Sequence, residues 1–229
     1  MKKLVLFDID GTLVLTGGAG MRAMNDAFED VFGVANAMRG VVLAGRTDRA
    51  IFEDMHARHG PSPTAADGQA ERFRERYLAR LSTEIMRPLP GKRVLPGVRP
   101  LLETLAVRDD IELALLTGNY AAGAEIKLSH FGLWSFFGWG AFGGDVVDRN
   151  ELLTRALLHA RERGMCPSSP RDVIVVGDTP YDVACAHSGG ALAVAVATGP
   201  CSIDELRATA AEVVLADLGD TTAFLAAIE

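Results

Sequence analysis

Short apolar segments alternate with helical patterns along most of this chain, and this alternation constrains the fold more than any other feature. The segments that read as strands are 3–7 (KLVLF), 111–116 (IELALL), 172–176 (DVIVV) and 192–198 (LAVAVAT), with a weaker one at 212–215 (EVVL). The helical patterns cover 98–106, 121–131, 150–163, 180–188 and 220–228. Strands that are apolar throughout are buried on both faces, as in a parallel sheet. The sequence therefore predicts an α/β fold, a Rossmann-like open parallel sheet with crossover helices.

The segment at 15–91 interrupts this alternation. It carries helical patterns at 21–33, 47–60 and 65–86 and no apolar β-run of any length. A return marked by Pro and Gly, PLPGKRVLPG, leads back to the alternating part of the chain. We therefore expect a core domain formed by residues 1–14 and 92–229 and a helical insertion formed by residues 15–91, with GGAG at 17–20 as the hinge between them.

Charge and composition restrict the partners. A formal net charge of -7 makes nucleic acid and anionic membrane surfaces unexpected partners. No apolar run approaches the ~20 residues of a membrane helix, and Asp8 and Asp10 lie where the apolar region of a signal peptide would have to be. The cysteines form no CxxC spacing, which is typical of free thiols in a reducing compartment. We expect a cytoplasmic protein, a monomer or a homodimer, with no nucleic-acid or membrane partner.

Acids and a hydroxyl follow the ends of several predicted strands. Asp8 and Asp10 follow the first strand, Thr117 the second and Asp178 another. Ligands of open α/β sheets bind beyond the carboxyl ends of the strands, so these groups should meet at one edge. Crowded acids repel each other unless a cation joins them, and oxygen ligands suit Mg²⁺. A simple turn with Gly11 at positive φ would explain the first pair alone, but not the other strand ends.

Three segments resemble the motifs of a known enzyme superfamily. FDIDGTL, LLTGN and VVGDTPYD are similar to motifs I, II and IV of the haloacid dehalogenase (HAD) superfamily, and they occur in the same order. The insertion at 15–91 lies where that superfamily carries its C1 cap. VLPGVRPLLETL and the GRTD at 45–48 resemble the phosphoglycolate-phosphatase-like branch. The resemblance covers essentially the whole chain and implies the HAD fold with a helical C1 cap.

The resemblance implies chemistry for each matching residue. Asp8 would be the nucleophile that forms an aspartyl-phosphate, and Asp10 the general acid and base. Mg²⁺ would be held by the Asp8 carboxylate, the Asp10 backbone carbonyl and the Asp178 side chain. The phosphate would be received by Thr117 and by the backbone amides of Gly118 and Asn119. The implied function is a Mg²⁺-dependent phosphatase that acts on a small phosphorylated metabolite, with phosphoglycolate as the first candidate.

The basic residue of motif III departs from the family pattern. Where most C1-capped relatives have a Lys-Pro run, this chain has GDVVDRNELL. Arg149 lies near the expected place, and Lys127 lies on the helix that follows Thr117, where it could also be solvated. The sequence favours Arg149 slightly and leaves both residues open.

Other residues have two interpretations. Asp182 fits position N3 of a capping box begun by Thr179, and it also fits the outer shell of the metal, two compatible roles. Arg46 and Thr47 are candidates for leaving-group specificity in the cap, although the sequence favours the interpretation that Thr47 and Asp48 mark only the start of a cap helix. The aromatic run at 131–144 is interpreted as packing around a turn.

Competing functions share most of these residues. A dehalogenase is disfavoured because its halide leaving group needs no proton, which would leave Asp10 without a task. A phosphomutase of the β-phosphoglucomutase type would share every core residue named above. A non-catalytic binding protein that keeps the fold is the remaining alternative, because a fold by itself does not establish activity.

Overall fold

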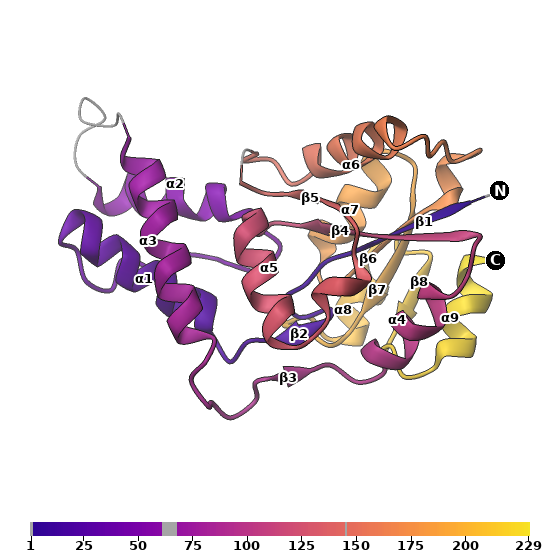
Figure 1. Cartoon of the computed structure of the whole chain (residues 1–229), viewed down its shortest axis with the longest axis horizontal. Helices are drawn as coiled ribbons and strands as arrows, with labels where there is room; N and C mark the ends of the chain where they lie inside the picture. The colour runs from indigo at the N-terminus through magenta and orange to yellow at the C-terminus, as the bar shows by residue number, and fades with distance from the viewer. Residues whose placement is uncertain (1, 61–67, 145) are drawn as a thin grey trace.

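A six-stranded sheet in the order β5-β4-β1-β6-β7-β8 forms the centre of the computed structural model, which describes residues 2–60, 68–144 and 146–229 (Figure 1). The strands are β1 (Lys3–Phe7), β4 (Ile111–Thr117), β5 (Gly140–Phe142), β6 (Val173–Gly177), β7 (Leu192–Val196) and β8 (Val213–Leu215), and neighbours are parallel. Phe7 is in register with Leu115 of β4 and Val176 of β6, so the carboxyl ends of these strands meet at one edge. The predicted open parallel α/β sheet is confirmed.

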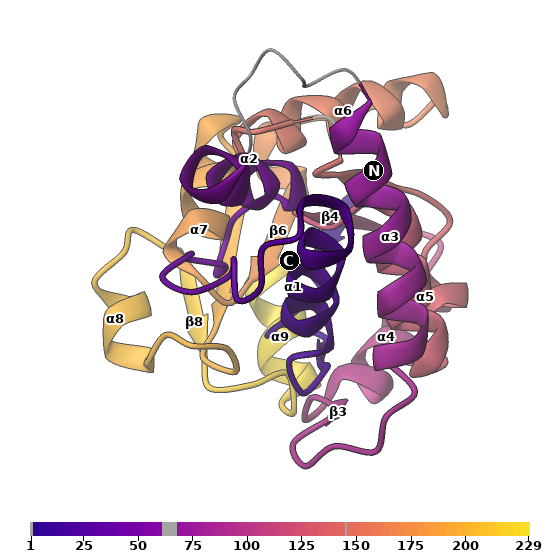
Figure 2. The same ribbon diagram turned by 90° about the vertical axis from the view of Figure 1, so that its left-hand side faces the viewer.

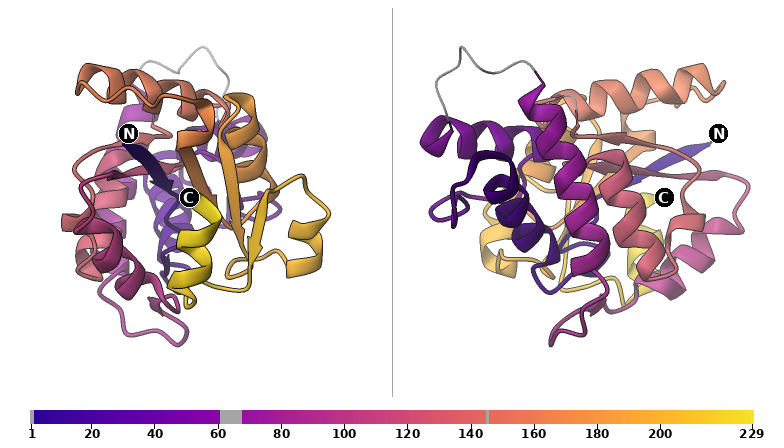
Figure 3. Two further views of the ribbon diagram at one scale, coloured as in Figure 1. Left: turned by 90° about the vertical axis from the view of Figure 1, so that its right-hand side faces the viewer. Right: turned by 60° about the vertical axis from the view of Figure 1, so that its left-hand side comes forward.

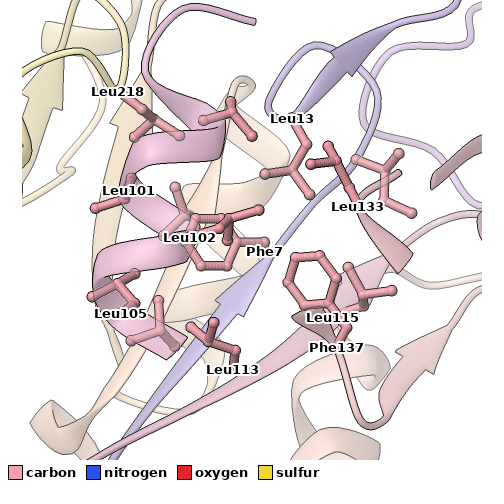
Figure 4. Close-up of a cluster of buried hydrophobic side chains, with 14 of the residues drawn as sticks. Phe7, Leu13, Leu101, Leu102, Leu105, Leu113, Leu115, Leu133, Phe137 and Leu218 are labelled. Atoms are coloured by element: carbon pink, nitrogen blue, oxygen red, sulfur yellow. The ribbon is translucent and has the colours of Figure 1, made fainter. Parts of the chain in front are cut away.

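Helices cover both faces of this sheet, which explains why its strands are apolar throughout. They are α4 (Val98–Ala106), α5 (Ala121–His130), α6 (Glu151–Glu162), α7 (Pro180–Ser188), α8 (Ile203–Arg207) and α9 (Thr221–Ile228). Neighbouring residues of β1 enter different clusters: Phe7 packs with α4, α5 and α9, whereas Leu6 packs with α6 and α7. Figure 4 shows Phe7 beside Leu102 of α4. Burying a side chain of this size stabilises the fold by roughly 1.5–3 kcal/mol.

The remaining helices form a separate layer beyond the carboxyl edge of the sheet. These are α1 (Ala19–Phe32), α2 (Asp48–His59) and α3 (Gln69–Glu84), which lie in front of the sheet in Figure 2. α1 packs along α3 (Figure 3), and the cluster shared by α1, α2 and α3 is formed mainly by Met24, Phe28, Phe52, Phe73 and Tyr77. The chain leaves the sheet domain through β2 (Val14–Leu15) and returns through its antiparallel partner β3 (Arg93–Val94). In the predicted helix at 65–86, residues 65–67 lie outside the described residues.

Several short elements were not predicted from the sequence, among them β2, β3, β5 and α8. The aromatic run at 131–144 is more than packing around a turn, because it contains β5, which pairs in parallel with β4. β5 is only three residues long and starts at a glycine, too short for a strand pattern to be recognised. α8 begins at a capping box of Ser202 and Glu205, and this S-x-x-E pattern is visible in the sequence. Among the described helices, none is both long and apolar enough to cross a membrane.

Candidate active site

A cavity of about 220 Å³ opens at the carboxyl edge of the sheet, between the sheet domain and the layer of α1–α3. Asp8 and Asp10 after β1, Gly118 and Asn119 after β4, and Asp178 after β6 all line it. Gly11 turns the chain with a φ of 88°, so the turn considered as an alternative for this segment is present within the site. The parallel register therefore brings the predicted strand-end residues to one place.

A cluster of buried acids lies at one side of the cavity, which Asp8 and Asp178 line directly. Asp8, Asp178 and Asp182 each offer a carboxylate oxygen, and these atoms lie within 4.8 Å of one another. Burial raises the pKa of Asp8 to about 6, against the opposing charge of Arg149. Burial, together with the nearby carboxylates of Asp182 and Asp8, raises the pKa of Asp178 to about 8. Ionisation of these carboxyl groups is therefore unfavourable in the folded protein, and a bound cation would offset that free-energy cost.

The hydrogen bonds of this cluster fit a hard divalent cation. Thr12 Oγ1 donates to Oδ1 of Asp178 at 2.9 Å, while Oδ2 of Asp178 is buried with no partner among the described residues. The backbone lies close to this carboxylate, because a Cβ atom added to Gly11 or Gly199 would overlap it. An unpaired, buried carboxylate oxygen beside a second acid is a suitable ligand for a divalent ion.

Asp182 is engaged differently from the other acids. Its Oδ1 accepts from Arg149 Nη2 at 2.5 Å, and its Oδ2 accepts from the backbone N–H and the Oγ1 of Thr179 at 3.0 and 2.7 Å. The predicted capping box at the start of α7 is therefore present. Since protein donors already occupy both oxygens, Asp182 is placed to orient Arg149 and the acid cluster from behind.

Arg149 and Lys127 are both at the site, but on different acids. Arg149 Nη2 lies 3.3 Å from Asp8 Oδ1 in addition to its bond with Asp182. Lys127 Nζ lies 2.6 Å from Asp10 Oδ2, and its side chain is only 5% exposed, so the alternative that Lys127 is solvated is wrong. Burial by itself would lower the pKa of Lys127, but the carboxylates of Asp10 and Asp48 outweigh it and raise that pKa.

Asn119 connects Lys127 and Asp10 to the end of β4. Its Oδ1 accepts from Lys127 Nζ at 2.6 Å, and its Nδ2 donates to Asp10 Oδ2 at 3.0 Å and to Thr117 Oγ1 at 2.8 Å. Thr117 is fully buried at the end of β4. The three residues predicted to bind phosphate therefore lie together, with the Asn119 side chain also orienting Asp10.

The loop before α2 contacts the sheet domain directly. The Asp48 backbone N–H donates to the Gly118 carbonyl oxygen at 2.7 Å, and Asp48 Oδ2 accepts from the Tyr120 backbone N–H at 2.8 Å. Thr47 is the N-cap of α2, accepting from Ala50 N–H, and its hydroxyl donates to the Val146 carbonyl at 2.7 Å. Thr47 therefore caps a helix and ties that helix to the sheet domain.

Arg46 lines the cavity, but its guanidinium is bonded elsewhere. Nη1 lies 2.9 Å from Asp54 Oδ2, and Nη2 donates to the Ala50 carbonyl at 3.0 Å. A Cβ atom on Gly118 would overlap the Arg46 carbonyl oxygen, so this loop needs glycine at position 118.

The structure adds residues that the sequence does not identify. Asp48 lines the cavity and is buried, and burial raises its pKa to about 7. The fully buried Tyr77 also lines the cavity, with no hydrogen-bond partner for its hydroxyl among the described residues. Thr12 holds Asp178. Thr12 and Asp48 each had a signal in the sequence, their places in the DGT and GRTD segments, whereas a tyrosine on an amphipathic helix is interpreted as core.

Known proteins match nearly the whole length of this chain. A model of the haloacid dehalogenase-like hydrolases matches residues 2–190. "Probable phosphatase IndB" of Dickeya dadantii is 30% identical over 94% of this chain and 90% of its own length. A phosphoglycolate phosphatase of Chromobacterium violaceum is 29% identical over 95% of each chain.

Solved structures share the fold over nearly the whole chain. A predicted phosphoglycolate phosphatase from Haemophilus somnus superimposes with a TM-score of 0.72 at 20% identity and 98% coverage of both chains. A β-phosphoglucomutase from Clostridium difficile superimposes with a TM-score of 0.68 at 16% identity, covering 100% of this chain and 97% of its own. At these identities the likeness establishes the fold alone.

Proposed function

The chain belongs to the haloacid dehalogenase-like hydrolases, and we propose that it hydrolyses a small phosphate monoester through an aspartyl-phosphate on Asp8. Family membership and the relatives named as phosphatases identify it as a phosphatase. The observation that carries the proposed mechanism is that each of the two aspartates after β1 has its own positively charged partner. Arg149 lies 3.3 Å from Asp8, and Lys127 lies 2.6 Å from Asp10.

Asp8 is the nucleophile in this proposal. One of its carboxylate oxygens attacks phosphorus, the ester P–O bond breaks, and the phosphoryl group is transferred to Asp8. Arg149 favours the ionised form of Asp8 against the burial that raises its pKa. The Arg149 guanidinium is oriented by Asp182 on its other side, so the nucleophile and its counter-charge are held in fixed positions.

Asp10 transfers the protons. It protonates the leaving oxygen as the ester bond breaks, and then takes a proton from the water that attacks phospho-Asp8 to release inorganic phosphate. Lys127 and Asn119 both donate to Oδ2 of Asp10, and no hydrogen bond from the described residues falls on Oδ1. Oδ1 is therefore the oxygen available to carry the proton.

Asp8, Asp178 and the Asp10 backbone carbonyl would hold a Mg²⁺ ion, with Asp182 supporting this group from behind. The unpartnered Oδ2 of Asp178 and the clustered carboxylates support this assignment. When bound, Mg²⁺ offsets negative charge on the phosphoryl oxygens and on the acids. Thr117, Gly118 and Asn119 would receive the other phosphate oxygens.

We also propose the domain roles. Residues 1–14 and 92–229 form the catalytic core, and residues 15–91 form the cap that contacts the leaving group. The antiparallel pairing of β2 with β3 at the two crossings supports this division. The relatives named as phosphoglycolate phosphatases make phosphoglycolate the first substrate to test.

Asp8→Asn tests the mechanism directly. It removes the nucleophile with little change in volume, so release of inorganic phosphate from p-nitrophenyl phosphate should fall to background while the melting temperature stays near that of the wild type. Asp109→Asn, on an exposed loop, is the matched control and should keep full activity. If Asp8→Asn retains substantial turnover, Asp8 is not the nucleophile.

A phosphomutase would use the same residues but pass the phosphoryl group from Asp8 to a second hydroxyl of the sugar. Incubation with β-glucose 1-phosphate separates the two activities. We expect inorganic phosphate as the product, and formation of glucose 6-phosphate without phosphate release would identify a mutase.

A further inference from the structure

The side of the cavity formed by the insertion, which would face the leaving group, is more apolar than the side formed by Asp8, Asn119 and Asp178, where phosphate would bind. Because Asp8 attacks from the sheet domain, the leaving group must point toward the insertion. There the cavity is lined by apolar side chains that include Met21, Met24 and Ile51. This surface suits an uncharged group.

The basic side chains that line the cavity, among the described residues, are already paired with acids. Arg149 bonds Asp182 and faces Asp8, and Lys127 bonds Asp10. Arg46, which comes from the insertion, bonds Asp54 and a backbone carbonyl. A carboxylate on the leaving group would therefore meet no unpaired cation at this end.

Beside Arg46 and Thr16, the polar side chains from the insertion that line the cavity, among the described residues, are those of Asp48 and Tyr77. Asp48 lines the cavity, and its one hydrogen bond from the described residues, donated by Tyr120 N–H, falls on Oδ2. Tyr77 is fully buried, and its hydroxyl has no partner among those residues. Gly20 lies against both Tyr77 and Lys127, since a Cβ there would stand 3.8 Å from Tyr77 Oη and 3.5 Å from Lys127 Nζ. Leaving a buried hydroxyl unpaired is costly, so a ligand group is the natural partner.

We propose, resting on the phosphatase function above, that the leaving group is an uncharged alcohol carrying a further hydroxyl that bonds Tyr77. Asp48 disfavours leaving groups that carry a carboxylate, because at a pH above its raised pKa of about 7 a second negative charge would face it across a small cavity. Phosphoglycolate is accordingly a poor substrate for this chain, although relatives carry its name.

A pair of substrates of nearly equal size tests the charge preference. 2-Hydroxyethyl phosphate and phosphoglycolate differ in having a CH₂OH group or a carboxylate at the same place. We expect kcat/KM for 2-hydroxyethyl phosphate to exceed that for phosphoglycolate by at least ~10-fold, as like charges placed together strongly disfavour binding. An equal or higher value for phosphoglycolate overturns this inference and leaves the phosphatase function intact. Absence of turnover on both esters and on p-nitrophenyl phosphate would instead remove the proposed function.

Asp48→Asn tests which residue sets the preference. Asparagine can still accept the Tyr120 N–H, so the loop keeps its contact, but the charge is gone. The preference for 2-hydroxyethyl phosphate should shrink several-fold in this variant and remain in Glu29→Gln, an equal charge change on an exposed residue of the insertion. An unchanged preference in Asp48→Asn overturns the role of Asp48. A selective loss of phosphoglycolate turnover in Arg46→Gln would mean that Arg46 receives the carboxylate, which also overturns the proposal.

Tyr77→Phe tests the hydroxyl contact without disturbing packing. Because the Tyr77 hydroxyl lacks a partner in the described protein, its removal should not lower the melting temperature. KM for 2-hydroxyethyl phosphate should rise ~5-fold or more, while KM for ethyl phosphate, which lacks the second hydroxyl, should stay the same. Equal effects on the two esters would contradict the contact.

Discussion

Lys127→Met and Arg149→Met should lower stability and kcat/KM by different amounts, because the two positively charged side chains pair with different aspartates. Methionine is unbranched and flexible, so each variant removes the charge while filling most of the space. Lys127 Nζ bonds Asp10 and Asn119. Arg149 bonds Asp182 and lies beside Asp8. The variants therefore perturb proton transfer and the nucleophile separately.

The loss of unfolding free energy in each variant depends on how well water can reach the aspartates that lose their partner. The side chains of Asp8 and Asp182 are 9% and 3% exposed, so Arg149→Met leaves two buried carboxylates without their counter-charge, which costs about 3–5 kcal/mol. The side chain of Asp10 is 42% exposed, so water replaces part of what Lys127 supplies and the cost is nearer ~1 kcal/mol. In urea unfolding, Arg149→Met should be the less stable variant by ~2 kcal/mol or more.

The kinetic difference should depend on the leaving group. An alkoxide needs the proton that Asp10 supplies, whereas p-nitrophenolate leaves without one. Lys127→Met should therefore lose ~10²-fold more in kcat/KM with ethyl phosphate than with p-nitrophenyl phosphate. Arg149→Met should lose similar factors with both esters, because each needs Asp8. Initial rates of phosphate release measure this, and the opposite dependence in the two variants would refute the assignment of the bases.

Two further predictions concern the acid cluster. Asp178→Asn should abolish the rise in melting temperature that Mg²⁺ gives the wild type by binding only the folded state, and an undiminished rise would place the ion elsewhere. In the metal-free protein, burial raises the pKa of Asp178 to about 8 and that of Asp48 to about 7, so the folded state holds these protons more tightly than the unfolded chain. The free energy of unfolding should therefore fall as the pH rises from about 5 to about 8. This fall should outweigh the opposite contribution of His130, whose pKa burial lowers. Urea midpoints in EDTA at the two pH values check this, and a higher midpoint at the upper pH would contradict it.

The parts of the site that the sequence predicts are those set by a strand and the turn after it. Asp8, Asp10 and Asp178 follow apolar runs directly, and parallel pairing is sufficient to bring them together. The position of Lys127 depends on how α5 packs against β1 and α3, which the helix pattern does not encode. The residues around Lys127 in the sequence do not show whether its side chain is buried or solvated. The sequence alone therefore does not decide between Lys127 and Arg149.

The site residues of the insertion are harder to predict from the sequence, for a related reason. Asp48 and Tyr77 are distant in sequence and reach the cavity only through the packing of α2 and α3. As a helix start, the Thr47–Asp48 segment was correctly interpreted, since Thr47 caps α2. What the sequence does not reveal is that the same two residues bond the sheet domain through Val146, Gly118 and Tyr120.

These bonds have a consequence for how the cavity selects its ligand. Asp48 belongs to the insertion by sequence but is fixed to the loop after β4, so its carboxylate keeps its place relative to Asn119 and the phosphate site. Among the described residues, α1, which carries Met21 and Met24, makes no hydrogen bond to the sheet domain, and it follows Gly17 and Gly18, both at positive φ. Substitutions on α1 should therefore change which leaving-group sizes are accepted, while the preference for an uncharged group stays with Asp48.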